Sequence, residues 1–188
     1  MRRLLVVLSS LVWVSAVAFA QAAAPDAAAP RRGFDFLIGE WSLHVHVKVS
    51  SLAALIHGTP TLVGTWKAEA GADGVDDDLR IMDASGNPVS GSKSHRVFDA
   101  TGTLWKITST DTYHGRTSEA SGHVQDGEVR IEGRSVDAAG NVVRTRTRYF
   151  AITQTSFRMQ QDRSTDDGQT WDEAVLTIDA QRAAAKAN

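Results

Sequence analysis

The chain has 188 residues, of which 42% are hydrophobic and 22% charged, and its formal net charge at pH 7 is −2. This length suits one domain that buries a core of its own. The chain contains no cysteine, which excludes a disulfide framework, a thiol nucleophile, a thiolate metal site and a lipidated N-terminal cysteine. A mildly acidic chain lacks the basic surface that binds phosphate backbones, so we expect no nucleic-acid partner.

Residues 1–20 have the pattern of an export signal. Arg2 and Arg3 precede an apolar run from Leu4 to Val17, and Ala-Phe-Ala at 18–20 is a small-x-small cleavage pattern. The run is short for a bilayer span, which needs about 20 residues. We therefore expect a periplasmic or secreted protein with no membrane span after cleavage; a signal anchor retained in the membrane is the alternative. Removal of this segment changes the formal charge from −2 to −4.

The remainder of the chain divides into three parts. Residues 21–32 are rich in alanine and proline, and we expect them to form a flexible lead-in. A single domain is expected over residues 33–181, and a disordered tail over residues 182–188.

Alternation of apolar and polar residues over 41–49 predicts a first strand with one buried face that begins at Trp41. His44 and His46 lie on the opposite face, at a spacing that can chelate a metal. The pattern contains no identifiable third ligand, so two exposed histidines are favoured and no metal site is expected. Residues 51–57 (Ser-Leu-Ala-Ala-Leu-Ile-His) predict a short helix or lid.

Beyond residue 80 the chain is divided by Asp/Gly turns at short intervals. Aspartate accepts hydrogen bonds from the backbone two residues on, and glycine supplies a positive φ. Separated by runs with period two, these turns predict a ladder of antiparallel hairpins with roughly eight to ten strands. A meander of that length closes on itself, so we expect an all-β, up-and-down antiparallel barrel that can hold one small ligand. The turns lie at residues 83–86, 99–102, 126–127, 137–140 and 166–168.

Hairpin geometry predicts which side chains share the interior. Asp99 is expected to pair with Thr103 through a glycine bulge, which assigns one face of that hairpin to the inside. Asp137 is expected to pair with Asn141, and the charged face of that hairpin then lies outside. Ser109 belongs to the inner face. The predicted ligand-binding residues on that face are His95, Trp105, Asp111, Tyr113, Thr147 and Tyr149.

The opening Phe-Asp-Phe-Leu-Ile-Gly-Glu-Trp at 34–41 resembles that of a family of uncharacterised bacterial secreted proteins, whose domains begin with Phe-Asp-Phe-Leu-x-Gly-x-Trp. The likeness extends to Gly-Gln-Thr-Trp at 168–171. Gly-x-Trp on a first strand also resembles the calycin superfamily, which includes lipocalins, fatty-acid-binding proteins and nitrobindin-like barrels. This resemblance implies that Gly39 lets the chain turn in and that Trp41 plugs one end of the barrel. No histidine aligns with the ligand of haem-binding calycins, so no haem and no other cofactor is expected.

Residues 164–171 (Ser-Thr-Asp-Asp-Gly-Gln-Thr-Trp) match an Asp-box, a folded hairpin that recurs in sialidases and other propeller proteins. Its aspartate and serine satisfy backbone donors, its glycine bends the chain, and its tryptophan packs beneath. A sialidase would carry several copies in a longer chain. A structural hairpin is therefore favoured over a glycan site.

Two charged clusters are predicted to lie in solvent. Four aspartates surround Gly74 within residues 73–78, but they lack the ligand order of a calcium loop. Arg144, Arg146 and Arg148 alternate along one strand, and Arg146 is expected to lie opposite Glu132 across the hairpin. A solvated salt-bridge face is favoured over an anion site.

Inward polar residues need partners, and a cavity that holds a polar or amphipathic ligand would supply them. A closed hydrogen-bond network with buried water is the alternative. We therefore predict an exported, lipocalin-like protein that binds a small, largely apolar ligand inside a β-barrel. One alternative is an enzyme on the same barrel with His95 and Asp111 as acid–base groups, although no G-x-S-x-G nucleophile motif is present. The other is an envelope structural or interaction module without a ligand.

Overall fold

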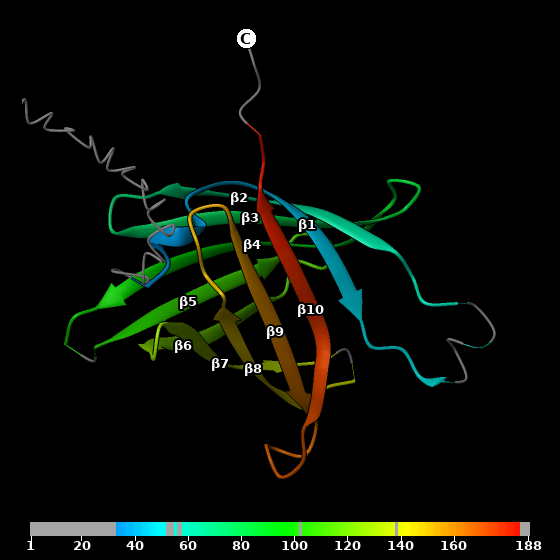
Figure 1. The fold of residues 1–188 in the computed structure, drawn as a ribbon. Coiled ribbons are helices and arrows are strands. Elements are labelled where there is room, and N and C mark those ends of the chain that lie inside the picture. The colour runs from blue at the N-terminus through cyan, green and yellow to red at the C-terminus, as the bar shows by residue number, and fades with distance from the viewer. Residues whose placement is uncertain (1–32, 52–54, 56–57, 102, 138, 185–188) are drawn as a thin grey trace, which may run out of the picture.

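The computed structural model describes residues 33–184 except 52–54, 56–57, 102 and 138. Ten antiparallel strands follow one another in sequence order and form a closed barrel (Figure 1). The predicted fold class, an all-β up-and-down barrel, is confirmed. The elements are η1 (Asp35–Leu37), β1 (Gly39–Val47), β2 (Leu62–Ala70), β3 (Gly74–Asp83), β4 (Pro88–Asp99), β5 (Leu104–Asp111), β6 (Thr117–Gln125), β7 (Glu128–Val136), β8 (Val142–Phe150), β9 (Ser156–Ser164) and β10 (Asp172–Arg182).

Several predicted segments are described only in part. The export signal at 1–20 and the lead-in at 21–32 lie outside the described residues. In the predicted helix at 51–57, Ser51 and Leu55 are helical, and residues 52–54 and 56–57 lie outside the described part of the chain. β10 extends to Arg182, one residue beyond the expected end of the domain.

The turns after β3 and β7 have the same chemistry. Asp83 accepts hydrogen bonds from the backbone N–H and the side-chain amide of Asn87, at 2.9 and 2.8 Å. Asp137 accepts the same pair of bonds from Asn141, at 2.9 and 3.2 Å. The backbone N–H of Asp137 also donates to the carbonyl of Asn141 at 2.9 Å, so the pairing predicted for this hairpin is confirmed.

The turn after β4 differs from the prediction by one residue. Asp99 pairs with Leu104 instead of Thr103, and Thr103 has a positive φ of 52°. One extra residue in a turn reverses the phase of the adjoining strand, so Arg96 faces the interior and His95 faces outward. Thr103 stands where the other two turns have asparagine, and threonine has no amide with which to bond the aspartate.

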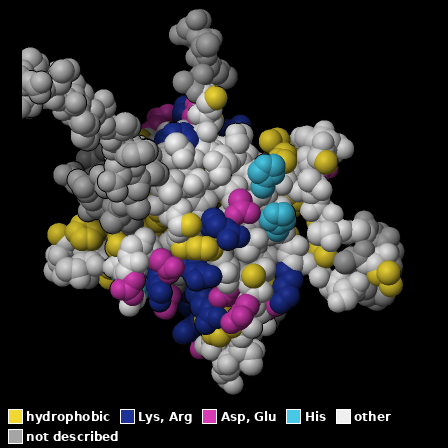
Figure 2. All heavy atoms as spheres, viewed as in Figure 1, with side chains coloured by type: hydrophobic (Ala, Val, Ile, Leu, Met, Phe, Trp, Pro, Cys, Tyr) yellow, Lys and Arg dark blue, Asp and Glu magenta, His cyan; other side chains and the backbone are white. Residues whose placement is uncertain are grey.

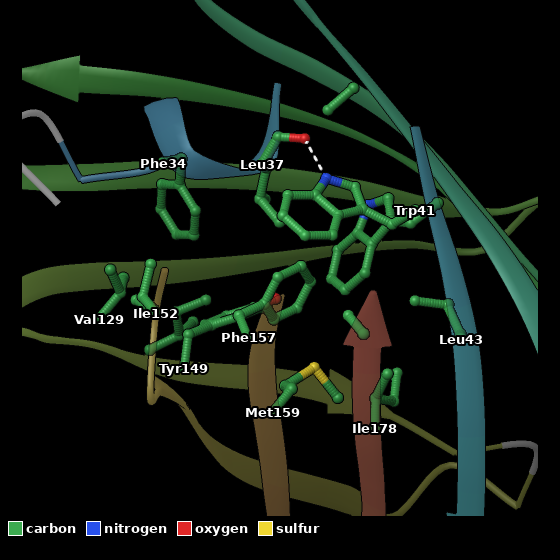
Figure 3. Packing of buried hydrophobic residues seen from close by; sticks show 14 of the residues in the cluster. Phe34, Leu37, Trp41, Leu43, Val129, Tyr149, Ile152, Phe157, Met159 and Ile178 are labelled. Carbon is green, nitrogen blue, oxygen red and sulfur yellow. Dashed lines mark hydrogen bonds between the residues drawn. The ribbon is translucent and has the colours of Figure 1, made fainter. Parts of the chain in front are cut away.

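One end of the barrel is closed by η1 and the residues around it (Figure 1). Phe34 and Leu37 have no exposed surface, and Trp41 is 1% exposed. The indole Nε1 of Trp41 donates to the carbonyl oxygen of Leu37 at 2.7 Å, which ties the helix to the first strand (Figure 3). Gly39 has a φ of 122°, a conformation that favours glycine and lets the chain turn from η1 into β1. Gly39 and Trp41 therefore occupy the positions expected of them.

The closed end is packed with aromatic rings (Figure 3). The ring of Phe157 lies 4.8 Å from that of Trp41 and 5.9 Å from that of Trp66, measured between centroids. The guanidinium carbon of Arg182 lies 4.2 Å from the centroid of Trp41, and its Nη1 donates to the carbonyl of Ile38 at 2.9 Å. The last strand thereby fixes the first strand as well as pairing with it.

Candidate functional site

The inward-facing residues divide into two zones along the barrel. Next to η1 they are buried; we call this zone the closed half. Further along the strands many of them are partly exposed, although Val45, Leu62, Ile81 and Val143 are buried there; we call this zone the open half. The closed half includes Trp41, Trp66, Val75, Arg96, Trp105, Val129, Tyr149, Phe157 and Ala180. The open half includes Val47, Leu79, Ser92, Ser109, Ser118, Ala120, Gly133, Ser135, Thr145, Gln161 and Leu176.

Small side chains line much of the open half. Ser94, Ser109 and Ser118 are partners in register across β4, β5 and β6. Ala120 and Gly133 are likewise partners across β6 and β7. Because these positions lie within strands of a closed barrel, their partial exposure indicates space inside the lumen. A ten-stranded barrel is wider than the eight-stranded kind that side chains alone just fill.

The two walls of the open half differ in polarity. The wall formed by β10, β1 and β3 presents Leu176, Val47, Leu79 and Ile81. The facing wall, formed by β4 to β9, presents hydroxyl and amide groups. A molecule with an apolar body and a polar edge would match both walls.

Some of these polar groups bond one another and others do not. The hydroxyls of Ser94 and Ser109 are 2.9 Å apart, and Gln161 Nε2 donates to Thr147 Oγ1 at 3.1 Å. Among the described residues, no hydrogen-bond partner lies within reach of the hydroxyls of Ser92, Ser118, Ser135 and Thr145. In the same part of the chain, no fully buried side-chain nitrogen or oxygen lacks a partner. The four residues are partly exposed, so solvent reaches them.

A buried ion pair lies in the closed half. Arg96 Nε donates to Asp77 Oδ2 at 2.6 Å, and Trp66 Nε1 donates to the other carboxylate oxygen at 2.8 Å. The guanidinium of Arg96 also lies 4.5 Å from the centroid of Phe34. Burial by itself lowers the pKa of Arg96, but the carboxylate of Asp77 outweighs it and leaves the pKa raised. Burial also raises the pKa of Tyr149, which faces this pair, to about 12.

Three of the six predicted site residues are buried on the inner face. Trp105 is 7% exposed, Thr147 is 8% exposed and Tyr149 is 3% exposed. Trp105 packs edge-on against Phe34 with 5.2 Å between ring centroids, so it belongs to the closed half. Thr147 lies at the boundary of the two halves through its bond to Gln161. Their assignment to the inner face is confirmed; a role in ligand binding stays a prediction.

The inward assignment of His95 is wrong because of the turn after β4. Its Nδ1 lies 2.7 Å from Asp76 Oδ1, and its Nε2 lies 3.5 Å from Asp73 Oδ1, all on the outer face. The hydrogen bond to Asp76 raises the pKa of His95. Part of the aspartate cluster at 73–78 therefore pairs with this histidine.

The inward assignment of Tyr113 is also wrong, whereas Asp111, the last residue of β5, is in register with Ser92 and keeps the phase of Ser109. Asp111 accepts hydrogen bonds from the backbone of Tyr113 at 2.8 Å and from His114 Nδ1 at 2.8 Å, as part of the β5–β6 turn. The bond from His114 and the two backbone N–H groups lower the pKa of Asp111 to about 2. Tyr113 is 51% exposed. His95 and Asp111 have different partners, so the acid–base pair of the enzyme hypothesis does not form.

His44 and His46 lie exposed on the outer face of β1, as predicted. Figure 2 shows histidine side chains over β1, and a mixed patch of basic and acidic side chains over β8 to β10. In the described part of the chain, no three His, Cys, Asp or Glu side chains are grouped closely enough to hold a metal ion.

Sequence reasoning missed Asp77 and Arg96. Val75 and Ile81 alternate in phase with Asp77, so the apolar pattern of β3 contained the signal that Asp77 points inward. The acidic run around Asp77 obscured that signal. Arg96 was missed because the phase of β4 was reversed.

No family model matches the chain, and no curated protein is significantly similar to it. Among the described residues, none forms a helix of the length and apolarity needed to cross a membrane.

Proposed function

We propose that the protein binds a small, largely apolar molecule in the open half of its barrel. The observation that carries this proposal is the set of inward hydroxyls that reach solvent within a closed barrel. An apolar core would be expected at these positions if they served stability alone. Hydroxyl groups without a partner instead supply the few convergent polar contacts that orient a ligand in an otherwise apolar pocket.

The chemistry of the two walls supports an amphipathic ligand. Leu79, Ile81 and Leu176 would cover an apolar body, with a gain of about 25 cal/mol for each Å² of apolar surface removed from water. Ser118 and Thr145 on the facing wall would bond a hydroxyl, carbonyl or carboxyl group on one edge. The ion pair of Arg96 with Asp77 is internally satisfied and is assigned no ligand contact.

The proposal also places the protein outside the cytoplasm. The pattern at residues 1–20 supports export, with a mature N-terminus at Gln21. N-terminal sequencing of the exported protein tests this separately from ligand binding. Recovery of Met1 in a membrane fraction would contradict it.

The ligand-binding proposal is tested with an apolar fluorescent probe, 1-anilinonaphthalene-8-sulfonate. Ser118→Leu adds an isobutyl group at an inward position whose hydroxyl has no protein partner, so it should fill lumen space without breaking a bond. Probe affinity is expected to fall about tenfold or more, which is about 1.4 kcal/mol. Thr117→Leu is the matched control because Thr117 is the neighbouring residue on the outer face of β6.

The melting temperatures of both variants show whether a loss of probe affinity is caused by unfolding. Equal probe affinity in both variants, with both folded, would overturn the proposal and favour an envelope module without a ligand. Mass spectrometry of an organic extract from the exported protein identifies the natural ligand class.

A further inference from the structure

A depression lies at the side of the barrel formed by β5 to β8. It has a volume of about 960 Å³, and its lining includes outward side chains of these strands, residues at inward positions such as Ile107, and residues of the β9–β10 hairpin. Lys106, Thr108 and Ser121 contribute polar atoms from β5 and β6. Ala120, Gly133 and Thr145 of the open half also contribute to its lining, whereas Ser118 does not.

Three charged side chains in this depression have no ionic partner. Glu119, Glu132 and Arg134 make no hydrogen bond or ion pair within the part of the chain that the structure describes. This holds even though Glu119 and Arg134 are direct partners in the β6–β7 register, and Glu132 is directly opposite Arg146. Other outer arginines are paired: Arg144 lies 2.7 Å from Asp167, and Arg146 lies 2.6 Å from Asp162.

The Asp-box hairpin adds an aromatic ring to the depression. Trp171 lines it, and one side of its ring faces the guanidinium of Arg146 at 4.5 Å. Arg146 is itself held by Asp162 and by Glu173, the latter at 3.2 Å. The ring is therefore fixed in place before any ligand arrives, which lowers the entropy cost of binding.

We propose that this depression is a saccharide-binding site. A sugar ring presents an apolar C–H face that packs on a fixed indole, and its hydroxyls both donate and accept. Carboxylates of Glu119 and Glu132 would accept from hydroxyls, and Arg134 would donate to ring or hydroxyl oxygens. Bonds of this kind to charged groups are stronger than neutral ones. Mixed charge in the lining argues against a polyanion, which would require an excess of basic residues.

The test begins with an array of neutral, N-acetylated and uronic-acid oligosaccharides, followed by calorimetric titration of the full exported chain with the oligosaccharide that binds best. Glu132→Gln and Arg134→Gln should each weaken binding about tenfold or more, because each removes a hydrogen bond to a charged group. Trp171→Phe should weaken it less, and Trp171→Ala should abolish it.

Glu128→Gln is the matched control, since Glu128 lies on β7 but outside the depression and already faces Arg130 at 3.2 Å. This variant should bind as the parent chain does. Ser118→Leu should also keep saccharide binding, so failure of the lumen proposal and failure of this one are distinguishable. Melting temperatures show whether Trp171→Ala has simply unfolded the hairpin; Glu132→Gln remains decisive in that case.

Three results would overturn the proposal: no array member binds, binding is unchanged in Glu132→Gln and Arg134→Gln, or only sulfated and polyuronic glycans bind and salt removes the binding. The last result would mean charge attraction without a built site.

Discussion

Arg96 and Asp77 are charged residues in a position that small barrels ordinarily fill with apolar side chains. Their side chains are 5% and 0% exposed, and they neutralise each other at 2.6 Å. In a buried pair of this kind, the attraction between the charges does little more than offset the cost of removing them from water. The pair therefore stabilises the fold no more than apolar packing would. Its effect is asymmetric, because loss of one partner leaves the other charge buried.

Asp77→Ala is therefore expected to destabilise the protein by about 3–5 kcal/mol. The double variant Asp77→Leu/Arg96→Met should recover most of that loss, since it leaves neither charge unpaired. Urea unfolding measures both. Asp78→Ala is the matched control: Asp78 pairs with the exposed Arg80 on the outer face, and its loss should cost less than about 1 kcal/mol. Equal costs at the two positions would contradict the assignment of Asp77 to the interior.

Ionisation of Tyr149 is expected to lower the stability of this region at alkaline pH. Burial raises its pKa to about 12, whereas the unfolded chain ionises tyrosine at about 10. The stability that neutral Tyr149 contributes is complete below pH 10 and is lost as the pH rises toward 12. Unfolding free energies of the parent chain and Tyr149→Phe should therefore converge over that interval. Lysines titrate in both proteins, so the difference between the two curves isolates Tyr149; a constant difference would contradict the assigned shift.

At the scale of single elements, turn chemistry decided what could be predicted from sequence. The β7–β8 and β6–β7 registers follow directly from an Asp-x-x-Gly-Asn turn and an Asp126-Gly127 turn, whose two central residues have φ values of 53° and 76°. The β4–β5 register does not, because Thr103 replaces the asparagine that completes the first type. One residue of error in that turn moved His95 and Arg96 to the wrong faces.

The candidate site was predictable only where strand phase was certain. Thr147 and Tyr149 follow a turn with an unambiguous register, and both face inward. Tyr113 was extrapolated beyond the end of β5 at Asp111, where the chain turns and alternation no longer applies. The saccharide depression depends on which outer charges remain unpaired, and pairing between strands distant in sequence cannot be read from alternation.

The Asp-box hairpin between β9 and β10 is expected to lose stability on acidification. The Thr170 hydroxyl, the Thr170 N–H and Ser164 bond Asp166 and lower its pKa to about 2. Because the folded pKa is below the unfolded value of about 3.9, this stabilisation is present above pH 4 and lost as the pH falls toward 2. Asp166→Asn should melt at a lower temperature than the parent chain at pH 7, and the gap should close over that interval.

Asp167→Asn is the control for this prediction. Asp167 is exposed and pairs with Arg144 at the surface, so the melting temperature of Asp167→Asn should stay close to that of the parent chain at every pH. A gap for Asp166→Asn that is independent of pH would show that the hairpin does not depend on the ionised carboxylate.

For the molecule as a whole, one strand pairing differs from all the others. Nine pairings join strands that are consecutive in sequence, while β1 and β10 join the two ends of the domain. Local pairings lose little chain entropy on formation, whereas this last one closes a loop of the entire domain. It also removes both free edges, which would otherwise be available for pairing with other chains. Closure of the barrel and protection of its strand edges therefore depend on the same pairing.

A chain that ends at residue 171, and so lacks β10, is expected to lose the closed barrel and to aggregate. It would expose the edges of β1 and β9, and it would lose Ile178 and Ala180, each 1% exposed, from the core. Trp41 would also lose the guanidinium of Arg182, although Trp41→Ala in the full chain should itself cost about 3–5 kcal/mol. Size-exclusion chromatography and circular dichroism measure the result, with a chain that ends at residue 184 as control. Addition of a peptide spanning 172–184 should restore the monomeric barrel, because the peptide supplies the missing pairings with β1 and β9. A truncated chain that stays monomeric and folded would show that closure by β10 is not what holds the barrel together.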